Sequence, residues 1–75
     1  GDTERAIEDY DVALELDDTL SLAYFNRGLM YYRLTEYEKA IADLETYLEL
    51  EVEAEDRGQV EDFVERLRGM IGSEQ

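Results

Sequence analysis

The chain has 75 residues, of which 21 are Asp or Glu and 7 are Lys or Arg, so its formal net charge is -14. It contains no Cys, His, Trp or Pro, which removes the thiolate and imidazole groups of most nucleophilic and zinc sites. The shortage of basic residues argues against binding to nucleic acid or to anionic membrane surfaces. Hydrophobic residues still make up 44% of the chain, including six Tyr and two Phe, which indicates a small folded domain.

Four helices are predicted, in chain order, over residues 2–16, 20–34, 36–50 and 56–71. The first, third and fourth have apolar residues at helical spacing with charged residues on the opposite face, as in amphipathic surface helices. The second is apolar nearly all round, which indicates packing on more than two sides. Thr35 and Glu38 have the spacing of a capping box for the third helix, and Asp56 and Gln59 that of a similar cap for the fourth. Residues 51–56 read as a linker, and residues 72–75 are expected to fray.

An internal repeat relates the first and third predicted helices. Shifting the sequence by 34 positions aligns the two segments and gives seven identical pairs. They include Ala6 with Ala40, Ile7 with Ile41, Asp9 with Asp43, Leu14 with Leu48 and Leu16 with Leu50. Thirty-four residues is the period of a repeat built from one helix-turn-helix unit.

The spacing of Tyr24, Gly28 and Tyr31, followed by Ala40 and Leu44, resembles the signature of the tetratricopeptide repeat (TPR) family over about residues 1–52. The resemblance implies an all-α fold of TPR-like antiparallel helix-turn-helix repeats, an α-solenoid fragment. Residues 1–20 would be the second helix of a partial repeat, 21–54 a full repeat, 55–71 a capping helix and 72–75 a tail.

The chain departs from the TPR pattern at several positions. The two Pro positions hold Asp18 and Val52, and Arg27 stands where the family has Leu, at what we expect to be the edge of the packing. Tyr47 replaces a small Ala at a close helix approach, so the fourth helix should pack differently from an ordinary repeat. Gly28 lacks a Cβ and should allow a neighbouring helix to approach at Ala6 or Ala40.

The resemblance also implies a partner-binding groove, because the first helix of each TPR lines the concave face. The residues that fall on this face are Phe25, Asn26, Leu29, Tyr32 and Arg33. The partner would be a segment of protein or peptide, bound without chemistry. We expect no catalytic residues, no cofactor and no metal site, since the acidic residues form the solvated stripes of the helices and match no calcium-binding loop.

The distribution of charge refines the expected partner. Residues 19–35 contain no Asp or Glu but do contain Arg27 and Arg33. The groove helix is therefore expected to be aromatic and mildly basic between acidic walls. A partner with a basic flank and an apolar or acid-tipped centre fits this arrangement.

Two alternatives remain open at this stage. The apolar faces that bear Ile7, Tyr10, Phe25 and Leu29 should be partly exposed, which favours self-association: a structural unit that mediates homo-oligomerisation through an apolar edge. The chain could also be an accessory segment of an enzyme whose active site lies elsewhere. No signal peptide or membrane-spanning stretch is predicted, and a cytoplasmic location is favoured.

Overall fold

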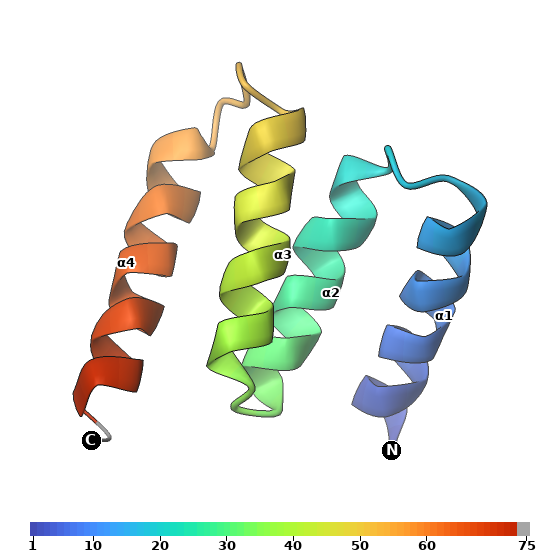
Figure 1. Cartoon of the computed structure of the whole chain (residues 1–75), viewed down its shortest axis with the longest axis horizontal. Coiled ribbons are helices and arrows are strands. Elements are labelled where there is room, and N and C mark those ends of the chain that lie inside the picture. The colour runs from blue at the N-terminus through green and yellow to red at the C-terminus, as the bar shows by residue number, and fades with distance from the viewer. Residues whose placement is uncertain (74–75) are drawn as a thin grey trace.

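The computed structural model describes residues 1–73, which form four α-helices side by side in chain order (Figure 1). They are α1 (Asp2–Leu16), α2 (Ser21–Arg33), α3 (Tyr37–Leu50) and α4 (Arg57–Ser73). The molecule measures 36 × 33 × 15 Å, so it is a thin slab, little thicker than one helix with its side chains. The prediction of an all-α, TPR-like arrangement is confirmed.

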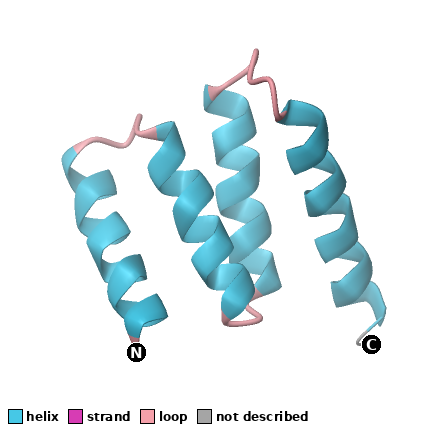
Figure 2. Ribbon diagram, turned by 180° about the vertical axis from the view of Figure 1, so that it is seen from behind, coloured by secondary structure: helices cyan, strands magenta, loops and turns pink. Residues whose placement is uncertain are grey.

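The helices stack in the order in which they follow one another in the sequence. Within residues 1–73, α1 packs on α2, α2 on α3 and α3 on α4, and the backbones of no other helix pair come close. Seen from behind, α2 crosses in front of the lower half of α3 (Figure 2). The short turn between these two helices makes them antiparallel neighbours, as its length predicts.

The helix ends differ slightly from the prediction. Glu36, not Thr35, occupies the cap position of α3, and no side chain caps it. Thr35 has a φ of 58° and its hydroxyl donates a hydrogen bond to the Leu34 carbonyl oxygen, so the capping box predicted at Thr35 is wrong. The turn between α2 and α3 requires the left-handed backbone conformation at Thr35. In this conformation the Thr35 hydroxyl lies near the Leu34 carbonyl oxygen and not near the first amides of α3. At the other end α4 continues to Ser73, two residues beyond the prediction, and residues 74–75 lie outside the described part.

The core lies between α3 and α4, with the aromatic residues of α2 packed against it. Leu44 and Leu67 are the largest of its fully buried side chains, and Ala40 is fully buried as well. The buried cluster consists of Ala40, Ile41, Leu44, Tyr47, Leu48, Val60, Val64 and Leu67. Because α3 contributes five of these eight residues, it is the central helix of the packing.

Gly28 sits where α2 approaches α3 most tightly. A Cβ on Gly28 would lie 3.2 Å from Leu44 Cγ and 3.3 Å from both the Ala40 carbonyl oxygen and Asp43 Cβ. The predicted close approach is therefore confirmed, with Ala40 rather than Ala6 as the neighbour. One of these three atoms, the Ala40 carbonyl oxygen, belongs to the helix backbone and cannot move aside as a flexible side chain can.

The expected exposure of apolar faces is only partly correct. Ile7 is buried in the contact with α2, while Tyr10, Phe25 and Leu29 are half-buried. The prediction is wrong for Ile7 because α2 alone is enough to cover that side of α1. The large apolar side chains that are exposed toward the N-terminal end of the molecule are Val12, Leu16, Leu20 and Leu22.

Candidate protein-binding face of α2

The five residues expected in a groove all lie on α2, but the structure gives them different surroundings. Phe25 is half-buried and its ring lies 5.0 Å from that of Tyr47, so it belongs largely to the packing of α2 on α3. Asn26 and Leu29 are half-buried, and Arg33 is exposed in the last turn of the helix. Surface for a partner is thus available mainly from Asn26 onward.

Tyr32 connects α2 to α4. Its ring lies edge-on to Phe63 with centroids 5.1 Å apart and makes a tilted contact with Tyr37 at 6.0 Å. Tyr32 nevertheless keeps 38% of its surface exposed. It is therefore held in place by two aromatic neighbours while one side remains open, which lowers the entropy lost when a partner packs on it. The residues Tyr37 and Phe63 were not singled out in the sequence, because their contribution depends on how α4 returns toward α2.

Arg27 lies at the centre of the three-helix contact, not at its edge as expected. Its guanidinium donates two hydrogen bonds of 2.8 Å to the Asp43 carboxylate and one of 2.8 Å to Asp11. The rings of Tyr24 and Tyr31 also face the guanidinium, with centroids 5.7 and 5.8 Å from its central carbon. This one side chain therefore joins α1, α2 and α3.

The charges of this cluster are balanced. Hydrogen bonds from Arg27 to Asp43 and then to Asp11 raise the pKa of Arg27, so the guanidinium is always charged. Asp43 is only 5% exposed and its two carboxylate oxygens are both occupied by Arg27. Arg27 consequently offers no free charge to a partner, and Arg33 alone supplies the basic character expected of this helix.

The end of the core opposite the α2–α3 turn contains a second polar contact. Tyr47 is buried and its hydroxyl donates a 2.8 Å hydrogen bond to the Asp56 carboxylate just before α4. This hydrogen bond, with burial second, raises the pKa of Tyr47. Arg57 donates to the Leu48 carbonyl oxygen at 2.8 Å, closing the end of α3. The large Tyr47 is thus tied to the loop before α4 through Asp56.

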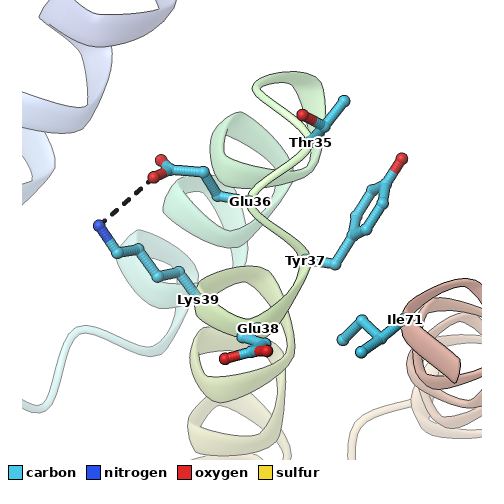
Figure 3. Close-up of a pocket in the computed structure, with 6 residues that line it drawn as sticks. All are labelled: Thr35, Glu36, Tyr37, Glu38, Lys39 and Ile71. Carbon is cyan, nitrogen blue, oxygen red and sulfur yellow. Dashed lines mark ion pairs between the residues drawn. The ribbon is translucent and has the colours of Figure 1, made fainter. Parts of the chain in front are cut away.

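A shallow, open pocket lies at the α2–α3 turn, lined by residues 35–39 and by Ile71 of α4 (Figure 3). Tyr37 and Ile71 form its apolar side, whereas Glu36 and Lys39 pair with each other at 3.5 Å. The ion pair leaves no unbalanced charge for a small anion. Among residues 1–73 no group of three or more acidic side chains is arranged to hold a metal ion, and no helix there is long and apolar enough to span a membrane.

The stacked helix pairs, the 34-residue register and the glycine at the close approach define a helical repeat protein. A family model described as tetratricopeptide repeat matches residues 1–65. The chain therefore belongs to the TPR family, as the spacing of Tyr24, Gly28 and Tyr31 predicts. Proteins of this family are generally non-enzymatic scaffolds for protein–protein interaction.

One curated relative is the TPR repeat-containing protein MJ1428 of Methanocaldococcus jannaschii, 45% identical over 53 residues. The match covers 65% of this chain and 9% of that protein, so this chain corresponds to a small part of the relative. No significant match to a solved structure was found.

Proposed function

We propose that this chain is a protein-interaction scaffold that binds a partner segment along the exposed side of α2, at Asn26, Leu29, Tyr32 and Arg33. Phe25 supports this surface from below by packing on Tyr47. The observation that carries the proposal is the half-open aromatic ring of Tyr32, oriented by Phe63 and Tyr37 and followed directly by the exposed Arg33.

Charge favours a particular kind of partner. α2 contains no Asp or Glu, whereas α1, α3 and α4 each carry several. Arg33 is the free cation of this helix because Arg27 is neutralised by Asp43 and Asp11. An apolar or aromatic segment with one acidic group for Arg33, and basic residues toward the neighbouring helices, complements this pattern.

The test is a peptide array followed by titration of the best ligand. Arg33→Glu should weaken binding about tenfold, the effect expected of a charged contact at an interface. Arg5→Glu makes the same charge change at an exposed position of α1 and should leave the affinity within about twofold. Equal losses from both changes would mean that only net charge matters and that α2 is not the binding face.

Tyr32→Ala is a second variant of the same face. It should weaken the same ligand and also lower the unfolding midpoint, since the contacts with Phe63 and Tyr37 are lost. The thermal unfolding curve separates the two effects. A ligand that binds the folded Tyr32→Ala variant as tightly as the unchanged chain would exclude Tyr32 from the binding surface.

Assembly of several copies is the second candidate function. It is supported by the exposed Val12 and Leu16 on one face of α1, with 56% and 84% of their surfaces open. Sedimentation equilibrium at micromolar to millimolar concentration should then show association that Leu16→Glu abolishes. A monomer over the whole range would refute this second candidate and leave the first untouched.

A further inference from the structure

An open pocket of about 480 Å³ lies at the end of the molecule where α2 begins. Its walls are formed by Leu22 of α2, by Tyr47 of α3 and by residues of the segment 51–56 that leads into α4. Figure 1 shows this segment and the start of α2 at the same end of the helix stack. Beside the pocket, the Ser21 hydroxyl donates a hydrogen bond of 2.6 Å to the Glu51 carboxylate. The pocket is therefore formed where α2, α3 and the segment before α4 are held together.

The pocket continues the exposed side of α2. Leu22 lies four positions before Asn26 and seven before Leu29, so the three side chains lie on one face of the helix. Leu22 is 65% exposed, the largest exposed fraction among the apolar side chains of α2. Between Leu22 and Asn26 in the chain, the half-buried Phe25 packs on Tyr47 of the pocket wall. A segment bound along α2 as in the proposed function, on which this inference rests, would therefore reach the pocket.

The carboxylates that line the pocket have no basic partner. Glu51, Glu55 and Asp56 form no ion pair within residues 1–73. Glu51 and Asp56 accept hydrogen bonds from neutral hydroxyl groups instead. Arg57, the next residue in the chain, pairs with Glu61 at 3.5 Å. The pocket thus combines an apolar wall with negative charge that the fold does not neutralise.

The opposite end of the same face of α2 has the opposite charge. Arg33 is exposed in the last turn of the helix, whereas Leu22 lies in the first. At a rise of about 1.5 Å per residue the two positions are roughly 16 Å apart along the helix axis. An extended segment rises about 3.3 Å per residue and covers this distance in about five residues. Charge complementarity therefore requires a basic group at one end of a bound segment and an acidic group at the other.

We propose that the pocket receives a Lys or Arg side chain of the partner segment, and that the same segment places an acidic side chain at Arg33, about five residues away. The methylene groups of a long basic side chain fit against Leu22, and its charged end reaches the carboxylates of the segment 51–56. The occupant is a side chain and not a metal ion, because the acidic residues among residues 1–73 are not grouped to coordinate one. The partner is therefore an extended segment in which apolar residues separate a basic residue from an acidic one.

The test uses a blocked peptide of sequence Lys-Leu-Ala-Leu-Ala-Glu and a matched peptide in which Gln replaces the Lys. Each peptide is titrated into the isotope-labelled chain, and the amide chemical shifts are followed by NMR. The Lys peptide should shift the amides of Leu22, Glu55 and Arg33 in one saturable titration. The Gln peptide should bind about fivefold more weakly, the loss expected of one charged contact near the surface.

Two pairs of variants separate the pocket from net charge and from general hydrophobicity. Glu55→Gln should weaken binding of the Lys peptide about fivefold and leave the affinity for the Gln peptide within about twofold. Glu8→Gln removes the same charge at an exposed position of α1 and should leave both affinities within about twofold. Leu22→Ala should also weaken binding of the Lys peptide, whereas Leu16→Ala, at a more exposed position of α1, should not.

Three results would overturn the proposal. They are equal affinities for the two peptides, equal effects of Glu55→Gln and Glu8→Gln, and a titration that leaves the amides of residues 51–56 unshifted. If Arg33→Glu still weakens the ligand selected from the peptide array, the binding face of α2 stands and only the pocket is rejected. If Arg33→Glu has no effect on that ligand either, the proposed function fails as well.

Discussion

Replacing Gly28 tests how closely α2 and α3 are packed. In Gly28→Ala the new Cβ would lie 3.2 Å from Leu44 Cγ and 3.3 Å from the Ala40 carbonyl oxygen. Both separations are shorter than ordinary carbon contacts, and the carbonyl belongs to helix backbone. The neighbours must therefore move by a few tenths of an ångström, or α2 must tilt away from α3.

Two effects of opposite sign set the magnitude. Alanine is better than glycine inside a helix by about 1 kcal/mol, and overpacking costs about 1–3 kcal/mol. We expect Gly28→Ala to lower the free energy of unfolding by about 1 kcal/mol. Gly28→Leu adds three further carbons to a filled space and should lower it by about 2–3 kcal/mol.

Thermal and urea unfolding provide the assay. For a domain of this size 1 kcal/mol shifts the midpoint by about 4–8 °C, so Gly28→Leu should reduce it by about 8–24 °C. Gly69 is the matched control, because it is an interior residue of α4 with nothing within 4 Å of its Cβ position. Gly69→Ala should stabilise the chain by up to about 1 kcal/mol. An unchanged midpoint in Gly28→Leu would refute the packing argument.

Three further predictions concern single contacts. Arg27→Met leaves the Asp43 carboxylate buried without its partner and should lower the free energy of unfolding in urea by about 3 kcal/mol. Adding Asp43→Leu should recover part of this free energy. If the losses of the two single variants simply add in the double variant, the ion pair does not couple Arg27 and Asp43. Thr35→Gly should raise the free energy of unfolding by about 0.5–1 kcal/mol, because glycine tolerates the φ of 58°. A lower free energy of unfolding would show that the Thr35 hydroxyl contributes more than the relief of backbone strain. The hydrogen bond to Asp56 raises the pKa of Tyr47. The stability that this bond contributes is therefore complete below about pH 10, the pKa of Tyr in the unfolded chain. It is lost as the pH rises through the pKa of Tyr47 in the folded chain. Tyr47→Phe should show a shallower alkaline decline than the unchanged chain, and identical profiles would exclude this role.

Much of the fold could be predicted because the decisive signals are periodic. The 34-residue shift, the small residues at Gly28 and Ala40 and the aromatic spacing around them determine which helices pack and in what order. Helix ends were less predictable. The tight turn requires Thr35 to adopt the left-handed backbone conformation. Because β-branched residues rarely adopt it, a Thr at this position does not predict it.

The candidate site was less predictable than the fold. The position of Arg27 in the repeat predicts a place at the edge of the helix packing. Its partners Asp11 and Asp43 are each 16 residues away and come from two different helices, so the sequence alone does not show that they meet Arg27. Similarly, Tyr32 gains its orientation from Phe63, which depends on the approach of α4. Assignments that rest on one helix alone, such as the exposure of Arg33, agree between sequence and structure.

Within residues 1–73 the backbone of each helix packs closely on its chain neighbours alone, and this has a consequence for how the molecule opens. α1 can detach by breaking its contact with α2, including the Arg27–Asp11 bond, while the buried cluster of α3 and α4 stays intact. Proteins of this architecture behave as one-dimensional arrays of coupled units. The rate of amide hydrogen exchange should therefore differ between the helices, highest in α1 and lowest in α3. Local unfolding of α1 should precede global unfolding of the molecule.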